Sequence, residues 1–126
     1  MIKIGVCGFG TVGQSFVNHV LAYKEKIIKN CGRDICISII ADRSIERKKF
    51  KTESIEFTSD ILSVLDSDCD LVVELIGGTD LAYDLVKGAI SKKKSVITAN
   101  KALIAEKGDD LFELSNKQNS YIGYEA

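Results

Sequence analysis

Proline is absent from this sequence of 126 residues, and no apolar run is longer than four residues. A membrane-spanning helix needs about 20 apolar residues in succession, so the sequence excludes a chain that crosses a bilayer. The N-terminal residues alternate between apolar and other types as a strand does. They lack the long apolar segment and the cleavage site of a secretory signal. We therefore expect a cytoplasmic protein without a membrane partner.

Histidine occurs once, as His19, and the cysteines Cys7, Cys31, Cys36 and Cys69 form no C-x-x-C pair. A zinc site needs sulfur and imidazole ligands that are more closely clustered. We interpret the cysteines as reduced thiols, which are typical of a cytoplasmic protein. A basic excess is also missing, because 17 Lys and Arg stand against 18 Asp and Glu. We therefore expect no nucleic-acid partner.

The composition that is present is that of a globular domain. Apolar residues make up 45% of the chain and charged residues 28%, which excludes a disordered tail, a collagen-like rod and a disulfide scaffold. The length of 126 residues suffices for one domain with its own core. It does not suffice for an enzyme that binds cofactor in one domain and substrate in another.

Apolar, β-branched runs alternate along the chain with segments of helical periodicity. The runs predict strands over 1–7, 35–41, 54–57, 70–76, 95–98 and 121–124. The periodic segments predict one long helix ending near Gly32, a short helix after residue 60, a helix after Thr79, and a helix over 102–119 broken at Gly108. Residues 43–54 predict a loop. This alternation indicates an α/β fold with a doubly wound, mostly parallel sheet of about five or six strands.

Three glycines follow the first predicted strand in the spacing G-x-G-x-x-G and open the first helix. The first glycine of this motif allows a tight turn, the second lets the backbone approach a pyrophosphate, and the third allows helix and strand to pack closely. Helix N-terminal amides then attract the phosphates. The candidate phosphate-binding turn of a Rossmann-like domain thus comprises Gly8, Phe9, Gly10, Thr11, Val12 and Gly13. The alternative is a glycine-rich turn without a ligand.

The second predicted strand ends in Asp42 and Arg43, where such domains contact the adenosine ribose. An acidic residue there accepts a hydrogen bond from the 2′-hydroxyl and favours NAD, whereas an arginine binds a 2′-phosphate and favours NADP. Because the two residues are adjacent, the sequence leaves both cofactors open. A merely exposed Arg43 is the alternative interpretation.

Glycine and polar residues also end two later strands, and ligands bind beyond the carboxyl ends of parallel strands. The candidate cofactor-binding residues there are Gly77, Gly78, Thr98 and Asn100, with Lys101 next in the chain. Asn100 can equally cap the following helix, and Lys101 can be an ordinary surface lysine. Glu74 lies within an apolar strand, so it is either paired or points out of the core.

Four blocks of the sequence resemble homoserine dehydrogenase. They are the glycine turn at 8–13 and the segments 72–78, 98–105 and 124–126. Their order and approximate spacing are similar to the nucleotide-binding half of that family, over essentially the whole chain. The resemblance implies an oxidoreductase that interconverts L-aspartate 4-semialdehyde and L-homoserine by hydride transfer with NADH or NADPH. This reaction belongs to threonine, methionine and isoleucine biosynthesis.

The resemblance also implies roles for individual residues. Lys101 would be one of two catalytic lysines, with Asn100 beside it, and Glu125 would be the first ligand of a sodium ion. Residues 1–126 would be the dinucleotide-binding domain of a longer, homodimeric enzyme whose catalytic and dimerisation domain is absent here. We expect such a domain to bind dinucleotide but not to turn over substrate unaided.

Two other functions remain open. One is the nucleotide-binding domain of a different NAD(P)-dependent reductase, which assays on other aldehydes and keto acids would distinguish. The other is a stand-alone NAD(H)-binding sensor, and Lys101 is evidence against it because a sensor needs no catalytic lysine.

Overall fold

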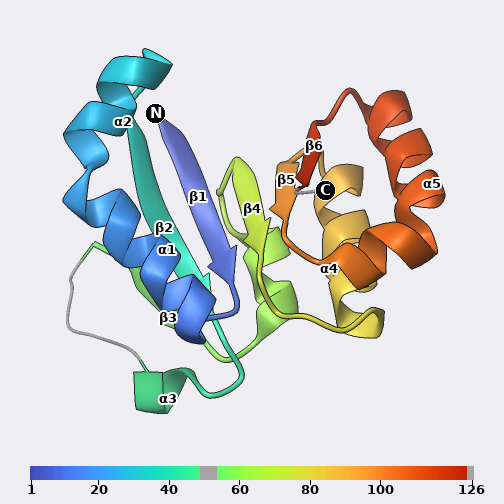
Figure 1. The fold of residues 1–126 in the computed structure, drawn as a ribbon, viewed down its shortest axis with the longest axis horizontal. Helices are drawn as coiled ribbons and strands as arrows, with labels where there is room; N and C mark the ends of the chain where they lie inside the picture. Colours follow the sequence, from blue (N-terminus) through green and yellow to red (C-terminus); the bar gives the residue numbers. More distant parts are fainter. Residues whose placement is uncertain (49–53, 125–126) are drawn as a thin grey trace.

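The structure, a computed structural model, describes residues 1–48 and 54–124. These residues form one parallel sheet with helices on both of its faces (Figure 1). The strands in this part of the chain are β1 (Ile2–Cys7), β2 (Ile35–Ala41), β3 (Glu56–Thr58), β4 (Leu71–Glu74), β5 (Ser95–Thr98) and β6 (Ile122–Tyr124). The helices are α1 (Thr11–Ala22), α2 (Lys24–Cys31), α3 (Ile45–Lys48), the 3₁₀ helix η1 (Ile61–Asp66), α4 (Asp80–Ser91) and α5 (Lys101–Gln118). No helix among these residues is long and apolar enough to cross a membrane.

The order of the strands confirms the predicted doubly wound sheet. Across the described residues it is β3-β2-β1-β4-β5-β6, and each neighbouring pair is parallel. The chain winds outward in one direction from β1 and in the other from β4. Loops that leave these two strands therefore diverge, and a crevice forms between them at the carboxyl edge of the sheet.

Apolar side chains bury both faces of the central strands. On β4, Val72 belongs to the core beneath α4 and α5, whereas Val73 belongs to the core beneath α1. Figure 1 shows the corresponding arrangement, with α1 and α2 beside β1 and β2, and α4 and α5 beside β5 and β6. Burial on both faces explains why these strands appear in the sequence as almost continuous apolar runs.

The prediction of one long first helix is wrong, because the helix bends at Tyr23 and divides into α1 and α2. The Tyr23 N–H still donates to the His19 carbonyl, and the Tyr23 carbonyl accepts from Ile27. Helix α1 buries Val17 and Val20, whereas α2 buries no residue completely. The contact of α2 with the core is made by the partly buried Ile27 and Ile28.

Two further expectations differ from the structure. The segment predicted as a loop includes α3, whose first residue, Ile45, is buried against the α1 side of the core. Helix α5 runs without a break through Gly108, which is buried. A glycine in a helix interior costs only about 1 kcal/mol relative to alanine, and the packing of Leu103 and Leu111 on either side of it holds the helix together.

Candidate functional site

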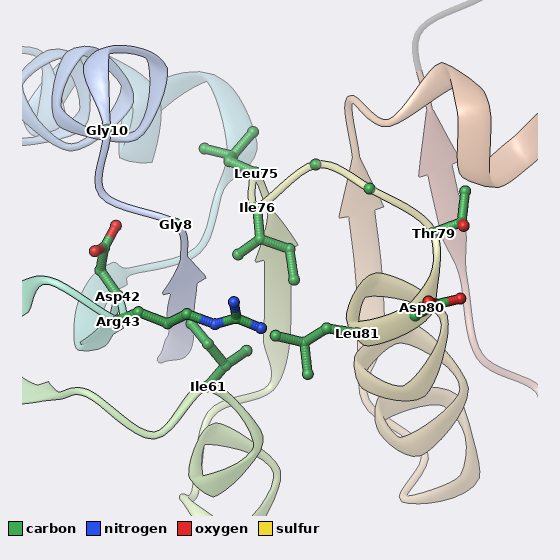
Figure 2. Close-up of a pocket in the computed structure, with 12 residues that line it drawn as sticks. Gly8, Gly10, Asp42, Arg43, Ile61, Leu75, Ile76, Thr79, Asp80 and Leu81 are labelled. Atoms are coloured by element: carbon green, nitrogen blue, oxygen red, sulfur yellow. The ribbon is translucent and has the colours of Figure 1, made fainter.

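A cavity of about 530 Å³ lies at the carboxyl edge of the sheet, where β1 and β4 diverge. Its walls come from the glycine turn after β1, the end of β2, η1, and the segment that connects β4 to α4 (Figure 2). The residues that line it are Gly8, Gly10, Asp42, Arg43, Ile61, Leu75, Ile76, Gly77, Gly78, Thr79, Asp80 and Leu81. The cavity thus gathers residues from four separate parts of the sequence.

The three glycines of the turn have three different environments. A side chain at Gly8, whose φ is +104°, would meet the Leu75 carbonyl oxygen at 2.6 Å. A side chain at Gly13 would meet the Gly8 carbonyl oxygen at 2.0 Å, whereas nothing lies within 4 Å of the corresponding position at Gly10. Gly8 and Gly13 are therefore required by the fold, and Gly10 leaves open space on the cavity side.

The remaining residues of the turn lead into α1. Phe9 is buried and stacks edge-on with Phe57, whereas Thr11 and Val12 are exposed on the first turn of the helix. No side chain caps this helix end, and its first turn contains no acidic residue. The N-terminus of α1 therefore offers backbone N–H donors and a partial positive charge to an anionic ligand.

Asp42 and Arg43 differ in orientation although they are adjacent. Asp42 is only 8% exposed, and its carboxylate accepts hydrogen bonds from the Phe9 N–H at 2.7 Å and the Ser44 N–H at 2.8 Å. It therefore fastens the glycine turn to the end of β2. Arg43 is exposed, and its side chain extends across the cavity between Ile61 and Leu81 (Figure 2).

Two glycines form the opposite wall. Gly77 and Gly78 have φ values of +74° and +70°, so both adopt the left-handed conformation that favours glycine. Figure 2 shows the segment from Leu75 to Thr79 arching opposite the Gly8–Gly10 turn. The backbone of this segment is thus presented directly to the cavity.

A second cavity of about 370 Å³ adjoins the first, and both are lined by Leu75 and Gly77. Its other lining residues are Val12, Glu74, Ala99, Asn100 and Lys101. Asn100 caps α5, since its side-chain oxygen accepts from the Leu103 N–H at 3.0 Å. Lys101 is exposed at the first position of that helix. The two adjoining cavities together extend along the carboxyl edge of the sheet.

Glu74 is a residue whose position the sequence left undecided. It is completely buried at the end of β4, where it accepts hydrogen bonds from Ile76, Gly77 and Thr98. Thr98 is also buried, so it contributes to the site through Glu74 and Asn100 rather than by exposure. A single glutamate inside an apolar strand was the signal in the sequence for such a buried network.

Cys7 and possible metal-binding clusters are two further candidates for chemistry in the part of the chain that the structure describes. Burial raises the pKa of the Cys7 thiol, so this residue, next to the glycine turn, stays a neutral thiol. Residues 1–48 and 54–124 contain no group of three or more His, Cys, Asp or Glu side chains that could hold a metal ion. Glu125, the sodium ligand implied by resemblance, lies outside the described residues.

A parallel sheet with a glycine turn after its first strand, and with cavities at its switch point, defines a dinucleotide-binding domain of the Rossmann type. Comparison with known proteins then identifies the family. Residues 8–125 match the model described as "Homoserine dehydrogenase, NAD binding domain". This chain belongs to that family, and binding of NAD(P) follows from the membership.

Individual relatives agree with this assignment. The chain is 40% identical to the homoserine dehydrogenase of Pseudomonas aeruginosa, over 99% of this chain and 29% of that protein. It is 31% identical to the Bacillus subtilis homoserine dehydrogenase, with the same coverage. The crystal structure of the Thiobacillus denitrificans homoserine dehydrogenase superimposes with a TM-score of 0.91 at 33% identity, over 98% of this chain and 29% of that one. The chain thus spans about 29% of the length of these relatives, and the matches favour homoserine dehydrogenase over the sensor and the other reductases.

Proposed function

We propose that this domain binds NADPH in preference to NADH, and the orientation of Arg43 is the observation that supports this choice. The Asp42 carboxylate accepts two backbone N–H groups and is nearly buried. The Arg43 guanidinium instead extends over the cavity beside it. A guanidinium forms paired hydrogen bonds with a phosphate, so this arrangement fits an adenosine ribose that has a 2′-phosphate.

The cofactor would lie in an extended conformation along the carboxyl edge of the sheet, across both cavities. The open space at Gly10 and the uncapped N-terminus of α1 fit the pyrophosphate. The adenosine half would then occupy the cavity beside Arg43, and the nicotinamide half would point toward the cavity beside Lys101. The sequence motif and the position of the cavities support the same direction of binding.

The reaction that we propose is the interconversion of L-aspartate 4-semialdehyde and L-homoserine. The domain would perform it together with a region equivalent to the remaining length of its relatives, which are homoserine dehydrogenases. When bound, the cofactor supplies the hydride. The protein must bring the aldehyde to the nicotinamide end of the site and must stabilise the negative charge that develops on the carbonyl oxygen.

We assign to Lys101 the stabilisation of the negative charge that develops on the carbonyl oxygen. It lines the second cavity as the first residue of α5. A cation at a helix N-terminus opposes the helix dipole, so stability alone does not account for a lysine at this position. Its ammonium group would stabilise the developing alkoxide, and the Asn100 cap fixes the helix turn from which it projects.

A steady-state assay of the complete gene product tests this function. We expect oxidation of NADPH with L-aspartate 4-semialdehyde, and a higher kcat/KM than with other aldehydes or with keto acids. A higher kcat/KM for one of those alternative substrates would contradict the proposal. Titration of the 126-residue chain with NADPH and NADH tests the cofactor preference separately.

We also propose a homodimeric enzyme in the cytoplasm. The cytoplasmic location is supported by the free thiols of Cys7, Cys31, Cys36 and Cys69, which fit a reducing compartment. The proposal of a dimer is supported only by the resemblance to the homoserine dehydrogenase family. Sedimentation of the complete gene product tests it, and a monomer at micromolar concentration would refute it.

A further inference from the structure

We propose that Glu74 is a positioning residue that joins the two walls of the nicotinamide-side cavity. This inference rests on the proposed function, because it assumes that the nicotinamide half of the cofactor enters the cavity beside Asn100 and Lys101. Glu74 itself would touch the protein rather than the substrate. Its carboxylate would hold the Gly77–Gly78 turn and the N-terminus of α5 at the separation that the cofactor requires.

The carboxyl group of Glu74 is the acceptor in each of its hydrogen bonds. Its Oε2 accepts from the Ile76 N–H at 2.9 Å and the Gly77 N–H at 3.3 Å. Its Oε1 accepts from the Thr98 hydroxyl at 2.5 Å. All three partners donate, and within the described residues no cation is paired with this side chain, which is 0% exposed.

These contacts belong to a ring of hydrogen bonds that is closed by the peptide bond between Gly77 and Gly78. The Thr98 hydroxyl oxygen accepts from the Asn100 N–H at 3.0 Å, and the Asn100 side-chain amide donates to the Gly78 carbonyl at 2.5 Å. The ring passes from Glu74 to Thr98, Asn100 and Gly78, and returns to Glu74 through Gly77. It connects the end of β4, the end of β5 and the first turn of α5, and Lys101 directly follows one of its members.

Stability does not explain a carboxylate at this position. A buried carboxyl group without a cationic partner is costly to desolvate, and apolar residues fill such strand positions at no such cost. Val72 and Val73, the two preceding residues of β4, are completely apolar and buried. The benefit of Glu74 is geometric, since one acceptor group orients two backbone amides of a left-handed turn and a hydroxyl of the neighbouring strand.

The test compares two ligands on the 126-residue chain. One is NADPH or NADH, whichever the wild-type chain binds more tightly, and the other is its adenosine end alone, 2′,5′-ADP or 5′-ADP. The fragment reaches only the glycine turn and Arg43, whereas the dinucleotide also needs the second cavity. The ratio of the two dissociation constants, measured by calorimetry well below the unfolding temperature, separates positioning from general destabilisation.

We expect Glu74→Leu to weaken dinucleotide binding by about tenfold or more and fragment binding by no more than about twofold, because three donors lose their common acceptor. Glu74→Gln should bind the dinucleotide within about threefold of wild type. Its amide oxygen can accept from Ile76 and Gly77 while its NH₂ donates to the Thr98 oxygen. Thr98→Val provides a second disruption with little change in shape and should show the same split as Glu74→Leu.

Leu111→Ala is the matched control. Leu111 is buried in the core beneath α5, three turns along the helix from Lys101, so its truncation should lower stability without changing the ratio. The proposal would be overturned if Glu74→Leu and Thr98→Val lost affinity equally for the dinucleotide and the fragment, or lost affinity for neither ligand. A wild-type chain that binds the fragment but no dinucleotide, or neither ligand, would instead refute the proposed cofactor binding itself.

Discussion

Gly10→Val is the substitution that separates folding from ligand binding most clearly. Gly10 precedes α1 with φ −79° and ψ −157°, an extended conformation that valine also adopts. Nothing lies within 4 Å of the position that its Cβ would occupy. We therefore expect the variant to fold, with an unfolding temperature within about 6 °C of wild type.

The expected loss lies in cofactor affinity. The valine side chain would fill the space in which we place the pyrophosphate and would shield the N–H donors of α1 from it. Each hydrogen bond to a charged group contributes about 1.5–3 kcal/mol. Losing two of them corresponds to at least a hundredfold weaker binding, since about 1.4 kcal/mol is a factor of ten. Calorimetric titration of the 126-residue chain with NADPH measures this change.

A dissociation constant within about threefold of wild type would refute the phosphate-binding role of the turn. Gly32→Ala serves as the control for stability. Gly32 ends α2 with φ +75°, so alanine is strained there, and the site lies elsewhere in the structure. This control should lower stability by about 1 kcal/mol and leave the NADPH affinity unchanged.

Four further substitutions test individual residues. Arg43→Ala should weaken NADPH binding about tenfold and NADH binding less than about threefold in parallel titrations, and equal losses would contradict a 2′-phosphate contact. Asp42→Asn places an NH₂ group against backbone N–H donors, so thermal unfolding should show a loss of about 1–3 kcal/mol, larger than any loss of affinity. Lys101→Ala in the complete gene product should lower kcat far more than cofactor affinity, and an unchanged kcat would exclude its role. Gly13→Ala forces a Cβ to within 2.0 Å of the Gly8 carbonyl, so circular dichroism should show a fall of roughly 10 °C or more in the unfolding temperature.

The sheet and the glycine turn could be predicted from the sequence because their signals are local. Continuous apolar runs indicate strands that are covered on both faces, and alternating helices impose the parallel order that the structure shows. The spacing of the three glycines also predicts their distinct steric roles, and the distances at Gly8 and Gly13 agree with them.

Other features depend on contacts that no local pattern contains. The bend at Tyr23 involves neither proline nor glycine, and it separates α1, which buries Val17 and Val20, from α2, which has only partly buried residues. The buried carboxylate of Asp42 depends on an amide 33 residues away, and that of Glu74 on a hydroxyl 24 residues away. Neither partner could be identified before the strands were placed side by side.

We propose above that a dinucleotide lies across the carboxyl edge of the sheet, from Arg43 to Lys101. The most direct test is a map of amide chemical-shift changes as NADPH is added to the isotope-labelled chain. We predict saturable changes at the glycine turn over 8–13, at Arg43, at Gly77 and Gly78, and at Lys101. Changes confined to the surface hollow over 21–26, at the bend between α1 and α2, or an absence of saturable changes, would contradict the account.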